Sequence, residues 1–73
     1  QAFYIYYDIG DNMEACIELI TYDWTNAGVV AINTDGPGGN MQLKTPVDIS
    51  IAQDFCTQAL KNVGYTVVGF TLI

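Results

Sequence analysis

The segment that decides the fold class spans residues 11–28 and reads DNMEACIELITYDWTNAG. Asp11 stands three residues before Glu14, which is the spacing of a capping box at the start of a helix. Apolar side chains then recur at the spacing of one helix face: Met13, Cys16, Ile17, Ile20 and Trp24. The pattern predicts an amphipathic helix that ends near Gly28, with Glu14, Glu18 and Thr25 on its solvent side.

A second helix is predicted over residues 50–63. Ser50 and Gln53 have the spacing of a capping box, Lys61 falls in the last turn, and Gly64 stands just past the end. Runs of alternating or β-branched residues predict strands at residues 3–9, 29–34, 41–47 and 65–73. Residues 35–40 contain three glycines and one proline, and this composition predicts a hairpin turn rather than an anion-binding loop.

These elements follow one another in the order β-α-β-β-α-β. Over 73 residues this order predicts one α+β domain, residues 1–73, with the split βαβ or ferredoxin-like fold. We expect a four-stranded antiparallel or mixed sheet in the spatial order 4-1-3-2, with both helices on one face.

The two cysteines, Cys16 and Cys56, lie on the apolar faces of the two predicted helices. Parallel helices with axes about 10 Å apart would bring their Cα atoms to about 5.5 Å, which suits a disulfide. The alternative is a pair of buried free thiols in a cytosolic core. An even cysteine count, the small size and a start at Gln1 favour the disulfide, and they predict a secreted, extracellular protein processed from a precursor.

Charge and composition narrow the classes of function. Eight acidic residues and two basic ones give a net charge of -6, which argues against nucleic acid as a partner. The chain has no histidine, so no Ser-His-Asp or Cys-His pair exists, and we expect neither catalysis nor a cofactor. No apolar run reaches the length of a transmembrane segment.

Several acidic side chains are expected to gather at the end of the fold where both helices begin: Asp8, Asp11, Glu14, Asp48 and Asp54. Helix capping and solubility explain them best. The weaker alternative is a Ca²⁺ site with oxygen ligands from Asp8, Asp11 and Glu14, although their spacing is not that of an EF-hand.

The predicted sheet has one face that no helix covers. We expect Tyr4, Tyr6, Tyr65 and Val67 on this face, where they would form an interface for self-association or for a second protein subunit. A tolerated apolar surface is the alternative, and RNA stacking is disfavoured by the charge. The last strand, residues 67–73, is an uncharged apolar edge that invites strand pairing.

The predicted helix Ser50–Cys56, the strand Met41–Val47 before it and the start at Gln1 resemble the small secreted killer toxins of yeasts and smut-fungus viruses, and related fungal effectors. The resemblance covers the whole chain as architecture. It implies a secreted, non-enzymatic protein of toxin or effector type that acts by contact with a cell surface or another protein. The alternative is a structural subunit of an extracellular homo-oligomeric assembly or filament.

Overall fold

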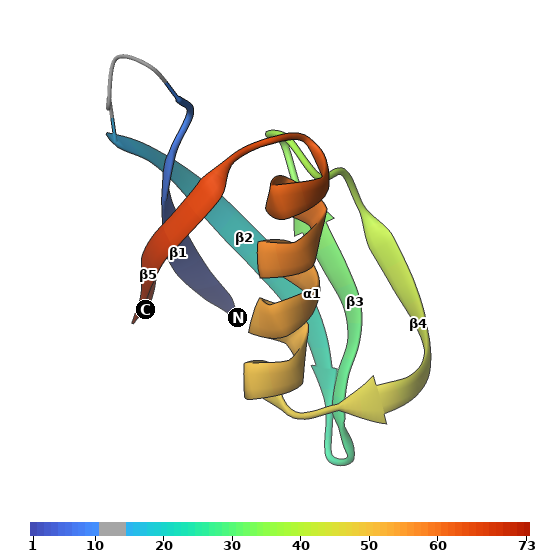
Figure 1. Ribbon diagram of the computed structural model, residues 1–73. Helices are drawn as coiled ribbons and strands as arrows, with labels where there is room; N and C mark the ends of the chain where they lie inside the picture. Colours follow the sequence, from blue (N-terminus) through green and yellow to red (C-terminus); the bar gives the residue numbers. More distant parts are fainter. Residues whose placement is uncertain (11–14) are drawn as a thin grey trace.

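The computed structural model describes residues 1–10 and 15–73, and within them it contains five β-strands and one α-helix. In chain order the elements are β1 (Ala2–Asp8), β2 (Ala15–Thr25), β3 (Gly28–Thr34), β4 (Met41–Val47), α1 (Ile49–Asn62) and β5 (Thr66–Leu72). The strands form one sheet in the order β4-β3-β2-β1-β5, and every neighbouring pair is antiparallel. The first four strands are thus a meander, and α1 connects the β4 edge to the β5 edge (Figure 1).

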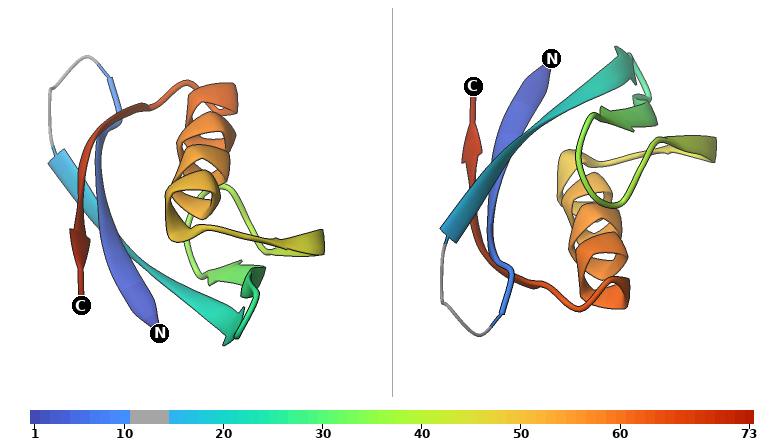
Figure 2. Two further views of the ribbon diagram at one scale, coloured as in Figure 1. Left: turned by 90° about the horizontal axis from the view of Figure 1, so that it is seen from below. Right: turned by 90° about the horizontal axis from the view of Figure 1, so that it is seen from above.

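The helix and the sheet pack as two layers around one apolar core. Figure 2 shows the sheet curling around α1, which lies against one face only. Ala52, Cys56 and Leu60 project from α1 at every fourth position and therefore share one helix face. They meet buried side chains from the strands, and the core cluster includes Phe3, Ile5, Tyr7, Ile20, Tyr22, Val29 and Ile32.

The predicted helix at residues 11–28 is wrong. Residues 15–25 form β2, which is paired with β1 on one side and with β3 on the other. The same segment also alternates with a period of two, because Ile20 and Tyr22 are buried while Ile17 and Leu19 are exposed. Backbone pairing with two neighbours outweighs the helical spacing in a segment rich in β-branched and aromatic residues. The predicted capping residues Asp11 and Glu14 lie outside the described residues.

The loss of this helix also overturns the predicted fold class. The fold is mostly β, with five antiparallel strands and one helix in the described residues, not a ferredoxin-like sheet of four strands under two helices. The segment predicted as the last strand does lie beside the first, as β5 beside β1. The other neighbour of β1 is β2, where the strand 41–47 was expected.

The second predicted helix is confirmed as α1, with a corrected start. Asp48 is the N-cap residue and makes no side-chain capping bond, so Ser50 lies inside the first turn and the predicted capping box is wrong. At the other end, the Gly64 amide donates to the Lys61 carbonyl oxygen at 3.0 Å, and Gly64 adopts a φ of 91°. Glycine just past the helix end is what the sequence predicted. No helix in the described residues is long and apolar enough to cross a bilayer.

Candidate functional site

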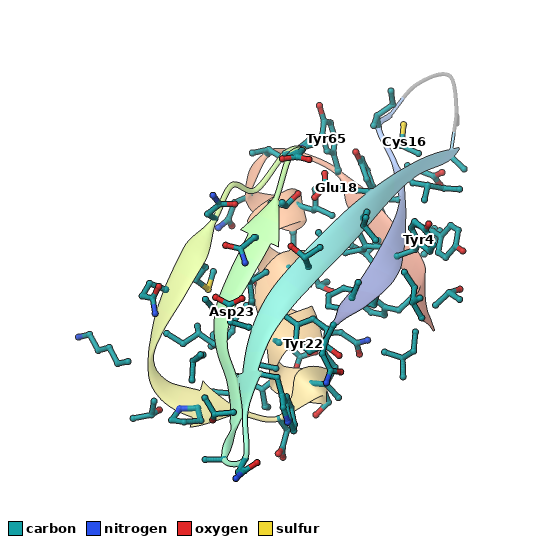
Figure 3. The ribbon with its side chains drawn as sticks, turned by 180° about the vertical axis from the view of Figure 1, so that it is seen from behind. Tyr4, Cys16, Glu18, Tyr22, Asp23 and Tyr65 are labelled. Atoms are coloured by element: carbon teal, nitrogen blue, oxygen red, sulfur yellow. The ribbon has the colours of Figure 1, made fainter. Side chains whose placement is uncertain are left out.

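One carboxylate lies inside the layer between the sheet and the helix. Glu18 projects from the middle of β2, opposite Ile5 of β1, and is only 8% exposed (Figure 3). The Thr34 hydroxyl at the end of β3 donates to Glu18 Oε2 and in turn accepts the Gly36 amide at 3.0 Å. The other carboxylate oxygen, Oε1, is buried and has no hydrogen-bond partner among the described residues. Glu18 is therefore a buried carboxylate of which only one oxygen accepts a hydrogen bond from the described residues.

The turn after β3 is shaped around this carboxylate. A Cβ atom added at Gly36 would overlap the Glu18 carboxyl group, so a larger residue there would displace the Glu18 side chain from its position beside Thr34. The Asn40 side chain accepts the Thr34 amide at 2.8 Å and closes the turn from its other end. The sequence predicted a turn here but gave no reason for glycine at this particular position.

A narrow pocket lies beside Glu18, between the turn and α1. Its polar side chains are those of Glu18, Thr34 and Cys56, and the rest of its wall is formed by glycines and apolar side chains such as Phe55 and Met41. The interior has room for about one water molecule, which is too little for an organic substrate.

Two titratable groups near Glu18, those of Cys56 and Tyr7, have raised pKa values. Burial, and then the negative charge of Glu18, raises the pKa of Cys56 to about 11. Burial also raises the pKa of Tyr7, with smaller contributions from Glu18, Cys16 and Tyr65. A thiol with such a raised pKa is protonated near neutral pH and is a poor nucleophile. The chemistry available in the pocket is hydrogen bonding within a core, rather than covalent catalysis by Cys56.

The predicted disulfide is wrong. Cys16 and Cys56 are both free thiols, and they do not come within bonding distance. The prediction placed both on parallel helices, whereas Cys16 lies on β2 opposite Tyr7 of β1. Cys56 instead faces the core from the middle of α1. An extracellular location stays a prediction, and it loses the disulfide as its support.

The described members of the predicted acidic cluster do not come together. Asp8 ends β1 and Asp48 follows β4, and because these strands run in opposite directions, the two carboxylates lie at opposite ends of the sheet. Asp11 and Glu14, the other candidate Ca²⁺ ligands, lie outside the described residues. Among the residues that are described, no group of three or more potential metal ligands occurs.

The second candidate site is the sheet face turned away from α1, which Figure 3 views directly. On β1 and β2 the side chains of Tyr4, Tyr6, Ile17 and Leu19 point to this side, and we call these four residues the open face. Tyr4 lies opposite Leu19, and Tyr6 lies opposite Ile17, as directly paired positions of neighbouring strands. Ile17 is 62% exposed, Leu19 45% and Tyr4 37%, so a compact apolar patch faces solvent.

Charged side chains flank the open face but do not enter it. Asp8 follows Tyr6 by two positions on β1, and Asp23 follows Leu19 by four positions on β2, so the two lie toward opposite ends of this side of the sheet. Neither lysine of the chain lies on β1 or β2. The centre of the open face is therefore uncharged.

The four predicted interface residues divide between the two sides of the sheet. Tyr4 and Tyr6 belong to the open face. Tyr65 instead stacks on Tyr7, with ring centroids 5.6 Å apart, and Val67 packs against the core on the helix side. Ile17 and Leu19 were missed because their segment was interpreted as a helix. Their alternation with Ile20 and Tyr22 is the signal that could have found them.

Comparisons with protein-family models, with curated proteins and with solved structures find no match to this chain. The resemblance to fungal killer toxins and effectors therefore stays a prediction.

Proposed function

We propose that this protein is a non-enzymatic interaction protein that self-associates by burying its open face against a second copy. The observation that carries the proposal is the exposure of Ile17, Leu19 and Tyr4 together on a sheet side that no other described layer covers. An antiparallel sheet with one solvated side normally carries polar residues there, and contiguous exposed apolar patches mark interaction surfaces.

The apolar area sets the expected strength of such an association. Full burial of a large apolar side chain stabilises by about 1.5–3 kcal/mol. The side chains of Ile17, Leu19 and Tyr4 are about half exposed, so about half of this amount is available from each. Six of them in a symmetric pair would then contribute about 6 kcal/mol, against an association cost of about 4–15 kcal/mol. The open face alone therefore supports weak, concentration-dependent association.

A second copy suits this surface better than a nucleic acid does. The two tyrosines offer stacking rings, but no basic side chain lies beside them to contact phosphates, and the chain carries a net charge of -6. Two copies can meet through the uncharged centre of the open face while Asp8 and Asp23 stay toward its ends, in solvent.

Sedimentation velocity at low concentration and NMR translational diffusion at high concentration, together from about 10 µM to about 10 mM, test the proposal, since a net gain of no more than about 2 kcal/mol corresponds to a dissociation constant on the order of 10 mM. The double variant Ile17→Thr/Leu19→Thr places β-branched side chains at both positions of β2 and removes most of the apolar area, so we expect it to lose the association through the open face. The matched control is Ile51→Gln, which removes a similarly exposed apolar side chain (41%) from the helix. A wild-type protein that is monomeric throughout this range would contradict the proposal, as would equal effects of the two variants.

A further inference from the structure

The two edges of the sheet differ in how they are protected against pairing. The β4 edge carries Lys44 and Pro46, a charge and a residue without an amide hydrogen, which are two common ways of blocking an added strand. The β5 edge, with one neighbour in the sheet, has no charged residue and no proline from Thr66 to Leu72. Figure 1 shows β4 and β5 at opposite edges of the sheet. Only the β5 edge is therefore open to a further strand.

The ladder between β5 and β1 shows which backbone groups of β5 are free. The Ile73 amide donates to the Ala2 carbonyl oxygen, so Ile73 turns its hydrogen-bonding groups toward β1. Alternate residues of a strand turn these groups to the same side, and Thr71, which lies opposite Tyr4, does so as well. The N–H and C=O groups of Phe70 and Leu72 consequently point away from β1, to the open edge.

The side chains along this segment leave the edge accessible. Phe70 turns to the helix side, where its ring lies edge-on to Phe3 at 5.8 Å between centroids. Thr71 turns to the other side, next to Tyr4. A register shift in β5 between Val67 and Gly69 interrupts regular pairing, so the regular part of the edge is its end from Gly69 to Leu72.

We propose that β5 pairs antiparallel with β5 of a second copy, around a two-fold axis at Thr71, to give a continuous ten-stranded sheet. In this register Phe70 of each copy exchanges both backbone hydrogen bonds with Leu72 of the other, and Thr71 faces Thr71. No charged side chains are brought opposite each other, although each chain carries a net charge of -6. The pairing places the open faces of both copies on the same side of the enlarged sheet.

This inference rests on the proposed function for the claim that the protein self-associates, and it adds a second, separate contact. The strand pairing joins two copies edge to edge and leaves both open faces uncovered on one side of the enlarged sheet, where they can be buried against another pair. A peptide from another protein is the competing occupant of such an edge. The second copy is favoured because one short segment supplies both halves of a symmetric set of hydrogen bonds.

The first test places a charge on the two-fold axis. Thr71→Lys brings two like charges together across the axis, and we expect the dissociation constant measured by sedimentation to rise about tenfold or more. Thr45→Lys is the matched control, because it makes the same change at an exposed position of the β4 edge. It should leave self-association at the wild-type level. Circular dichroism of both variants verifies that the fold is kept.

The second test traps the register covalently. Residues that face each other in a pair without backbone hydrogen bonds have Cα atoms about 4.5 Å apart, within the range of a disulfide. In a Cys16→Ala background, Thr71→Cys should therefore form a covalent dimer when oxidised glutathione is added, and Thr45→Cys should not. A cross-link at both positions or at neither would overturn the proposed register.

The outcomes separate the two proposals. If the open-face double variant is monomeric while Thr71→Lys associates like the wild type and Thr71→Cys does not cross-link, the strand pairing is wrong and the proposed function stands. If Thr71→Lys weakens association and the open-face variant does not, the strand pairing stands and the role of the open face is wrong. A wild-type protein that is monomeric at every concentration overturns both.

Discussion

Replacing Thr34 with valine keeps the shape of the side chain but removes the hydroxyl that donates to Glu18 Oε2. A hydrogen bond to a charged group contributes about 1.5–3 kcal/mol, and its loss costs most where the acceptor is buried. Glu18 is 8% exposed and its Oε1 has no partner among the described residues, so the variant removes the one hydrogen bond that the carboxylate has there. We predict a loss of about 2 kcal/mol in the free energy of unfolding, or about 8–16 °C in Tm for a domain of this size.

The predicted loss of stability in Thr34→Val depends on the negative charge of Glu18. A second substitution, at Glu18 itself, separates the hydrogen bond to this charge from the other interactions of Thr34. In a Glu18→Met background the acceptor is absent, and the same Thr34→Val change should cost only what the lost Gly36 contact contributes, about 0.5–1 kcal/mol. The lost contact to the Gly36 amide is common to both backgrounds and cancels in the cycle. Glu18→Met by itself should be neutral or stabilising, because an apolar side chain of similar length replaces a buried anion that lacks a full set of partners.

Urea unfolding followed by far-ultraviolet circular dichroism measures all four proteins, and the fluorescence of Trp24 provides a second probe. An equal cost of Thr34→Val with and without Glu18 would show that the hydrogen bond to Glu18 does not stabilise the fold. A loss of more than about 2 kcal/mol in Glu18→Met would show that Glu18 stabilises the fold by interactions other than the one with Thr34.

Three further predictions concern pH, backbone strain and salt. Folding raises the pKa of Cys56 from its ordinary value of 9.0 to about 11. The free energy of unfolding therefore does not depend on this group below pH 9, and it decreases as the pH rises from about 9 to 11. The fall should be on the order of 2 kcal/mol, with Tyr7 adding to it at higher pH, and unfolding curves of Cys56→Ala should show a shallower pH slope. Gly28→Ala should lower the free energy of unfolding by about 3 kcal/mol, because Gly28 has a φ of 134° and an added Cβ would lie 2.5 Å from the Val47 carbonyl oxygen. Gly69→Ala is the control: its added Cβ meets no atom, and the free energy of unfolding should change by less than about 1 kcal/mol. Self-association should strengthen between about 20 mM and 500 mM NaCl, because salt screens the repulsion between copies that each carry a net charge of -6, and a sedimentation series that shows weakening would contradict an uncharged interface.

The candidate site was only partly predictable from the sequence. Tyr4 and Tyr6 follow from the alternation of β1, which a single strand displays without reference to its neighbours. Ile17 and Leu19 required the knowledge that residues 15–25 form a strand between two others. Glu18 was expected in solvent, since a lone acid on a predicted helix belongs on the wet side, and it is buried because alternation on β2 turns it toward the core.

The sequence by itself determined the elements whose signals are local. The helix α1, the glycine after it, and four strands follow from spacing and from turn residues within each segment. The tertiary structure decided the state of residues 15–25, because this segment carries both a helical and an alternating pattern. The choice depends on β1 and β3, which supply hydrogen bonds to both sides of the backbone of β2 and cover only its alternate side chains. From that one choice follow the separation of the two thiols, the burial of Glu18 and the uncovered apolar side of the sheet.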